Sequence, residues 1–551
     1  MPMNPSLSSP SLPEFARMGL PAQLDVLRLT DFRQRARYLL ESSHGAELMA
    51  RLPVQDAFLM FKVLGAENYP ELLELLSAEQ WTGFFDLDCW VKDRFDSDKA
   101  RVWLSYLLET EPEQIVATLL QLDFELLVLL IRKEVTILAG PEQIEDEEEL
   151  QEAMRSDGGY LLDFRDEDGA KLFGSLFALL FGMTPDFYRY LMSAVHAETE
   201  SLIEESVYQQ RAARMTDWGF CEPFGAGSVY AWLDPHKYLE LQHGKQPLGV
   251  VEVGAAPGFS LQFRVNGGLL AELLAQGISE EQAWELTALT NKVLLADQID
   301  PGDADRVARS VRQVHATLNL ALDWLADNDL NRAEKWLADC YLEDLFRVGF
   351  SLTLLLQRRA AKIVDSKIFP YLDPQQRFFL SALRRRPPQL PVSLVEVDQD
   401  GTREFASRQE LLRAERLLDR LELLEQLFTK TYVFDLPAAA DLDLAECQPT
   451  AAEELTLAHL FLTALANHVL GREFVPVPIH VADMVALHGM VSIDGRLNED
   501  LARETEAWLE NLLPGAGFFA GECLELWREG FCAVPVEQLD ARFVSGLIVK
   551  N

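Results

Sequence analysis

The sequence predicts an all-α protein made of several helical blocks, the first of them a superhelical repeat, with a minor β-hairpin. Three observations carry this prediction. Apolar residues recur three and four positions apart over most of the chain, as on one face of a helix. Capping and turn residues repeatedly restart that pattern. A clear pair of strands is expected only near residues 392–405.

The composition is that of a folded but strongly acidic chain. Of 551 residues, 48% are hydrophobic and 25% are charged, as is usual for globular proteins. Lys and Arg total 49 and Asp and Glu 88, so the net charge is −39. Such a charge repels polyanions and no sizeable basic patch interrupts it, so we expect no nucleic-acid partner.

Neither the first residues nor the cysteines indicate secretion or a membrane. Residues 1–20 lack a basic start and a continuous apolar core, and the longest apolar runs are too short to span a bilayer. No two cysteines have CxxC spacing, so they are expected to be reduced and mostly buried thiols. We therefore expect a cytoplasmic protein without membrane insertion. The cysteines are Cys89, Cys221, Cys340, Cys447, Cys523 and Cys532.

The first block is expected over residues 25–135. Phrases beginning at Leu52, Leu76 and Leu122 each combine leucine with a capping residue or proline and then an acid or amide, which restarts a helix. Their spacing is irregular, so the repeat is degenerate.

The phrase Leu-Pro-x-x-Asp-Ala at 52–57, with the Leu-rich helices after it, resembles the superhelical cytosolic N-terminal domain of MgtE-type magnesium channels. The resemblance covers about residues 45–135. It implies stacked helices but fixes no magnesium-binding residue.

An acidic linker containing residues 145–149 precedes the second block, which is expected over 160–245. Gly219 is expected to end the helix that runs through residues 204–218.

The string Tyr208…Arg211…Arg214…Asp217–Trp218–Gly219–Phe220 resembles one in a family of long acidic bacterial proteins of unknown function. Residues 290–297 and 539–547 carry the same resemblance, which makes it nearly full length. It transfers no activity.

The third block is expected over residues 263–430. It starts with a helix near Leu269–Gln276 and a second helix that Ser279 caps and that extends to Ala296. The hairpin pairs Val392–Val397 with Thr402–Phe405.

Ser407 and Glu410 have capping-box spacing before a Leu-rich helix that ends near Lys430. A last helical region is expected over residues 453–551.

The sharpest motif is the segment from Val250 to Ser260, which resembles motif I of rRNA-type S-adenosylmethionine-dependent methyltransferases. In this alternative Glu252, Gly254 and Gly258 would bind the cofactor, because small residues permit close backbone approach. The context argues against it, since a second strand bearing an acid should follow and helices are expected instead. An extended linker is the other interpretation.

Metal sites and catalytic constellations are not expected. Three Asp-Gly turns suggest calcium loops, but Ser175, Ser407 and Leu501 stand where the bidentate Glu is needed. His480, Met484 and His488 are spaced as on a helix, yet prolines just upstream interrupt the segment. No GxSxG elbow or phosphate-binding loop occurs. We therefore expect neither a metal nor a cofactor.

The main hypothesis is a helical scaffold or protein-interaction protein, because stacked helices present extended surfaces to partners. The alternatives are the methyltransferase just described and a divalent-cation-responsive regulatory protein, suggested by the MgtE-like segment. A protein partner is expected, and the oligomeric state stays open.

Overall fold

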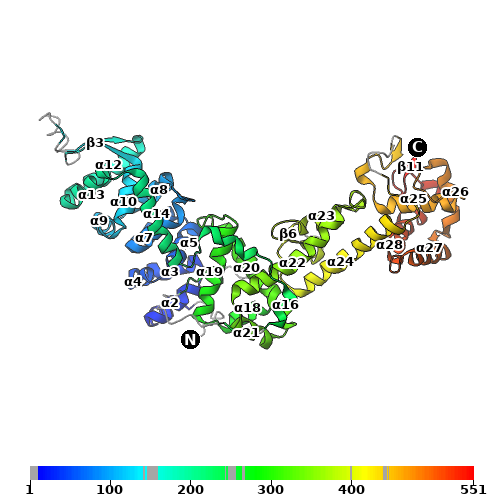
Figure 1. The fold of residues 1–551 in the computed structure, drawn as a ribbon, viewed down its shortest axis with the longest axis horizontal. Helices are drawn as coiled ribbons and strands as arrows, with labels where there is room; N and C mark the ends of the chain where they lie inside the picture. The colour runs from blue at the N-terminus through cyan, green and yellow to red at the C-terminus, as the bar shows by residue number, and fades with distance from the viewer. Residues whose placement is uncertain are drawn as a thin grey trace. The chain divides into compact units, whose positions relative to one another are not determined.

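The computed structural model describes residues 10–140, 143–144, 159–241, 244–245, 256–262, 267–396, 400–437, 444 and 446–550. They form two compact units, Met1–Gly349 and Phe350–Asn551. This division is coarser than the four predicted blocks, which stay a prediction. The fold is mostly helical with small strand pairs, so the predicted fold class is confirmed (Figure 1).

Unit 1 consists mainly of short helices that follow one another. Its helices are α1 (Leu12–Ala16), α2 (Leu20–Leu29), α3 (Phe32–Glu41), α4 (Gly45–Ala50), α5 (Val54–Leu64), η1 (Ala66–Asn68), α6 (Pro70–Leu73), α7 (Ala78–Asp88), α8 (Ser97–Leu108), α9 (Pro112–Gln121), α10 (Phe124–Glu134), α12 (Glu167–Met183), α13 (Pro185–Ala197), α14 (Glu200–Asp217), α15 (Pro223–Ala226), η2 (Gly227–Tyr230), α16 (Pro235–Glu240), α17 (Phe259–Gln262), α18 (Leu269–Gln276), α19 (Glu280–Ala296), α20 (Ala304–Ala326) and α21 (Leu330–Asp339).

Helix α22 (Leu342–Val364) begins in unit 1 and ends in unit 2. The other helices of unit 2 are η3 (Phe369–Tyr371), α23 (Pro374–Leu383), η4 (Val392–Leu394), α24 (Arg408–Gln426), η5 (Leu427–Thr431), η7 (Ala452–Glu454), α25 (Leu457–Val469), η8 (Val481–Asp483), α26 (Met484–Val491), α27 (Glu499–Leu512), α28 (Gly517–Trp527), η9 (Arg528–Cys532) and η10 (Val536–Gln538).

The strands of the described residues make small local sheets. Four are antiparallel pairs: β1 (Trp90–Val91) with β2 (Arg94–Phe95), β3 (Val135–Ala139) with β4 (Leu161–Phe164), β5 (Leu390–Pro391) with β6 (Thr402–Arg403), and β9 (Ser492–Ile493) with β10 (Arg496–Leu497). A fifth sheet has β11 (Val549–Lys550) between β7 (Cys447–Gln448) and β8 (Ile479–His480), antiparallel to the former and parallel to the latter.

The predicted hairpin near 392–405 exists, but the expected first strand is wrong. Leu390 pairs with Arg403 and Pro391 with Thr402. Residues 392–394 instead form a 3₁₀ turn, in which the Val395 and Glu396 N–H groups both donate to the Val392 carbonyl. The pairing is therefore shorter than predicted and begins two residues earlier.

Local capping signals define several helix starts. Ser77 caps α7 through a capping box with Gln80, and Ser279 caps α19 in the same way with Gln282. Each box satisfies N–H groups that the first turn leaves free. Gly219 follows α14 with a φ of +82°, so the predicted stop is confirmed.

The core of unit 1 is rich in aromatic side chains. Trp103 has its ring centroid 5.1 Å from that of Phe84 and 6.1 Å from that of Phe58, and Trp81 packs edge-on against it at 6.4 Å. All four are almost fully buried. Large aromatic rings contribute much of the apolar area that stabilises such a core.

All six cysteines are free thiols, and Cys221 alone is not fully buried. Among the described residues, no single helix has both the length and the apolar composition needed to cross a bilayer. Helices α9 and α10 pass that test only when taken together, and they are bent by 110° at the break between them.

Candidate functional site

The sequence-predicted cofactor residues fall mostly outside the described residues. Glu252 and Gly254 are not among them, nor is the strand predicted to carry them. Gly258 is described, and its N–H donates to Asp56 Oδ2 at 2.7 Å. A Cβ at Gly258 would lie 2.3 Å from the carbonyl oxygen of Arg28. The missing side chain of Gly258 therefore lets its backbone pack closely against α2 of the same chain, and not against a cofactor.

Asp56 belongs to an ionic network that joins α2, α3, α5 and α19 and is buried except at Glu280 of α19. Its carboxylate lies 4.0 Å from Arg35, and neither side chain has exposed surface. Arg35 also donates to the carbonyl of Leu27 at 2.8 Å. Burial raises the pKa of Asp56, and Arg35 and the Gly258 N–H oppose this. Arg28 donates to the carbonyl of Ala256 and pairs with Glu280 at 3.1 Å.

Downstream of Gly258, the described residues up to 349 form helices and no strand. Helices α18 and α19 have the bounds that the sequence predicts. Asp297 is the C-cap of α19 and accepts a hydrogen bond from the Tyr230 hydroxyl at 2.9 Å. A nucleotide-binding unit requires a second strand after the glycine loop. In the described residues of this part of the chain, helices stand in its place.

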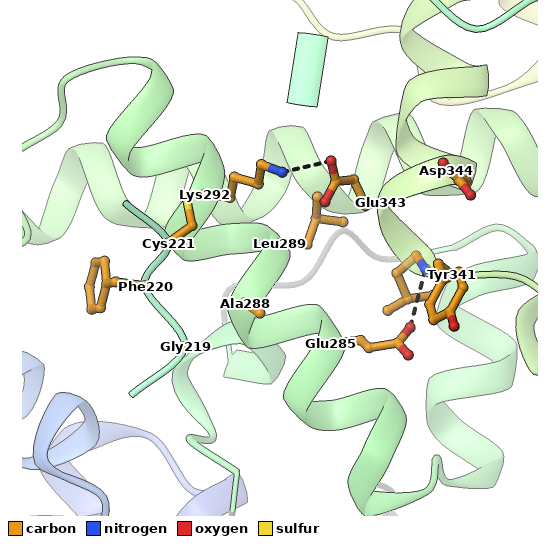
Figure 2. A pocket seen from close by; sticks show the side chains of 11 residues that line it. Gly219, Phe220, Cys221, Glu285, Ala288, Leu289, Lys292, Tyr341, Glu343 and Asp344 are labelled. Carbon is orange, nitrogen blue, oxygen red and sulfur yellow. Dashed lines mark hydrogen bonds and ion pairs between the residues drawn. The ribbon is translucent and has the colours of Figure 1, made fainter. Parts of the chain in front are cut away.

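A cavity of about 490 Å³ lies in unit 1 over one face of α19, a volume typical of small-ligand sites. Figure 2 shows its wall, which combines the segment after α14, one side of α19 and the start of α22. The lining residues are Gly219, Phe220, Cys221, Glu285, Ala288, Leu289, Lys292, Tyr341, Leu342, Glu343 and Asp344.

The charged groups of this cavity already have partners within the chain. Lys292 pairs with Glu343 at 2.7 Å. Glu285 accepts from the Leu342 N–H at 3.2 Å (Figure 2). It also pairs with Lys245 at 2.5 Å. A ligand would have to compete with these ion pairs, so the surface that remains available is mainly apolar.

Cys221 is the cysteine among the residues that line this cavity. Burial raises the pKa of its thiol, and the positive charge of Lys292 only partly opposes that effect. The thiol therefore stays protonated near neutral pH, and the thiolate is the reactive form. The cavity suits binding better than covalent catalysis.

The histidines noted in the sequence do not share one helix. His480 lies in β8, whereas His488 is a buried residue of α26. Within the described part of the chain, no group of three or more His, Cys, Asp or Glu side chains could hold a metal ion.

Helix α26 has an exposed side without a charged or polar side chain. Val485 is 56% exposed and Met490 52%. Ala486 and Gly489 lie between them in sequence and are also exposed. The opposite side of the helix is buried, through Met484, Leu487, His488 and Val491. This side of the helix, with the residues that extend it at both ends, is called the α26 face below.

The α26 face extends beyond the helix. Val477 and Ile493 are each 58% exposed, and Val481 is 43% exposed. Asp483 is the one charged residue in Val481–Val491, and Arg472 pairs with it at 2.6 Å. Several exposed apolar side chains close together in sequence are typical of interaction sites.

This exposed face was not predictable from the sequence. The sequence does show a short helical segment with few polar residues on any side. Helices at a protein surface usually have one polar side, so such a segment is unusual there. Periodicity cannot tell such a helix from a buried one.

Comparison with known proteins gives one finding. No curated protein and no solved structure matches this chain. A family model described as a family of unknown function matches residues 13–550, which confirms the near-full-length resemblance to such a family. The MgtE resemblance of the first block stays a prediction. The chain belongs to the family of unknown function DUF6178.

Proposed function

We propose that this protein is a helical scaffold that docks a partner protein through the α26 face. The observation that carries the proposal is the exposed, uncharged side of α26, formed by Val485, Ala486, Gly489 and Met490. Contact between apolar side chains and water is unfavourable in free energy, so a partner that covers these side chains is stabilised by their burial.

The face is held firmly from behind. Helix α26 packs against α25 and η9. His488 lies edge-on to Phe531 with centroids 5.4 Å apart, and the Cys532 thiol reaches the Val491 carbonyl at 3.8 Å. A preorganised surface loses little conformational entropy on binding, so it supports affinity.

The methyltransferase alternative predicted from the sequence has less support. The N–H of Gly258 already donates to Asp56, and its Cα faces the backbone of Arg28, so no space for a cofactor remains at this glycine. Glu252 and Gly254 lie outside the described residues.

The free thiols favour a cytoplasmic location, which is part of the same proposal.

The test places a photo-crosslinking amino acid at Val485 of the full-length chain, expressed at native level in its host. Val91 is the matched control, because it is also a valine and is 58% exposed, in β1 of unit 1. A docked partner gives one discrete adduct from position 485 and none from position 91.

A neutral double variant, Val485→Asn with Met490→Asn, should abolish complex formation while leaving the far-ultraviolet circular dichroism and melting temperature near wild type. The absence of any adduct at position 485 at native abundance would overturn the proposal. So would an adduct that the double variant does not weaken.

A further inference from the structure

We infer that the partner segment at the α26 face is an amphipathic helix with Lys and Arg flanking its apolar side. This inference rests on the proposed function and adds the chemistry of the occupant.

The shape of the face favours a helix. Ala486 and Gly489 are exposed and three positions apart in α26, so they share one stripe of the helix. A Cβ built at Gly489 would meet nothing within 4 Å, so the surface there is open. Larger side chains border the stripe, namely Val485 on one side and Met490 on the other. A helix lies naturally along such a stripe with its apolar residues at helical spacing.

An added strand is a poorer occupant. Strand β8 stands at the edge of its sheet, but it comprises only Ile479–His480. Two residues offer too few main-chain hydrogen bonds for binding by strand addition, which relies on those bonds for affinity.

A second copy of this chain is also a poorer occupant. The segment Val481–Val491 is about 16 Å long at 1.5 Å per residue. A single helix against its copy would cover only a short surface, so no large interface offsets the repulsion between two copies. Each copy also carries a net charge of −39, which opposes self-association.

Charge then selects among foreign helices. Residues 451–551 hold 6 Lys and Arg against 15 Asp and Glu. The face itself contributes no charge, and the other residues of this stretch give it a net charge of 6 − 15 = −9. Basic residues beside the partner's apolar side would speed and orient its binding, and acidic residues there would be repelled.

The experiment uses the full-length chain and three fluorescent 18-residue peptides. The first has a Leu/Ala side flanked by Lys, the second carries Glu in place of Lys, and the third is a scrambled Lys peptide without an apolar side. Binding is followed by fluorescence anisotropy at low and at high salt.

The expected result is that the Lys peptide binds about tenfold more tightly than the other two at low salt. High salt should weaken it, because the flanking charges are screened. The Val485→Asn/Met490→Asn variant should lose about tenfold in affinity, since both replacements are neutral and only remove apolar surface. The control Val91→Asn should bind as the wild type does.

Other outcomes separate this inference from the proposed function. Equal binding of the Lys and Glu peptides, weakened by the double variant, overturns the basic partner but leaves the docking face. Binding that the double variant does not affect overturns the inference, because a diffuse acidic surface then explains it.

Two further outcomes also overturn the inference. Self-association of the full chain that the double variant removes would make a second copy the occupant. Sedimentation with phosphatidylcholine or phosphatidylserine vesicles would make it a lipid surface. Cross-linking at Val485 in cells still decides the proposed function in each case.

Discussion

Asp56 and Arg35 show what a single buried charge costs. Neither side chain is exposed, so each one's charge depends on the other. We predict that Asp56→Ala destabilises unit 1 by about 3–5 kcal/mol, because it leaves the Arg35 guanidinium buried without its counter-charge. Chemical denaturation followed by tryptophan fluorescence measures this loss, since Trp81 and Trp103 lie in the same unit.

The matched control is Asp98→Ala, because the Asp98 side chain is 73% exposed while it pairs with Arg165. That change should cost less than about 1 kcal/mol, as exposed ion pairs contribute little. Equal losses at the two positions would contradict the assigned role of Asp56.

His459 provides the clearest pH dependence. Burial lowers the pKa of its imidazole to about 4, and its Nδ1 faces the N–H and hydroxyl of Thr456. The unfolded state binds a proton near pH 6.5 and the folded state does not, so the stability of unit 2 falls as pH decreases from about 6.5 toward 4. Between pH 7 and 5 the loss is about 2 kcal/mol, measurable by denaturation at each pH.

The variant His459→Gln isolates that effect. Glutamine at this position keeps the capping box with Thr456 but does not titrate. The variant should therefore lose less stability than the wild type over the same pH interval. An identical pH profile for the two proteins would show that His459 does not set it.

At the residue scale, the sequence predicted features that depend on residues a few positions away, such as helix caps. Ser279 and Ser407 cap their helices as expected, because the two partners of a capping box are only three positions apart. The contacts of Gly258 were not predictable, since its partners Arg28 and Asp56 lie more than 200 residues away. A glycine allows close backbone contact either with a cofactor or with another segment of the same chain. The sequence alone does not distinguish these two roles.

At the element scale, replacing two glycines by alanine should change the stability of unit 1 in opposite directions. Gly219 ends α14 at a φ of +82°, where a Cβ is strained, so Gly219→Ala should destabilise unit 1 by about 1–2 kcal/mol. Gly174 is inside α12 and an added Cβ would meet nothing within 4 Å, so Gly174→Ala should stabilise it by about 0.5–1 kcal/mol.

Thermal and chemical denaturation of both single variants check this prediction, and each serves as the other's control. Shifts of the same sign would contradict it, because backbone conformation would then not decide the effect.

At the element scale, long periodic segments were predictable and short ones were not. Helices α18 and α19 were predicted with their bounds, whereas β5 starts two residues before its predicted position. A two-residue strand is fixed by its partner rather than by its own alternation. The exposed side of α26 was missed for a related reason, since only its neighbours α25 and η9 determine which side is covered.

At the scale of the whole molecule, the sequence suggested four blocks and the structure has two compact units. Composition marks linkers, but it does not reveal which blocks share a core. The core cluster that contains Phe15 extends to Val311, so residues from three predicted blocks pack into unit 1. Such long-range packing is what local patterns leave undetermined.

This division predicts how the chain unfolds. A chain with two compact units generally unfolds in more than one step, since each unit has its own cooperative core. We therefore expect calorimetry of the full chain to resolve at least two transitions. Asp56→Ala should lower only the transition of unit 1, and acidification to pH 5 should lower the transition of unit 2 less in His459→Gln than in the wild type. One transition that both changes shift together would instead mean that the continuous helix α22 (Leu342–Val364) couples the units into a single cooperative structure.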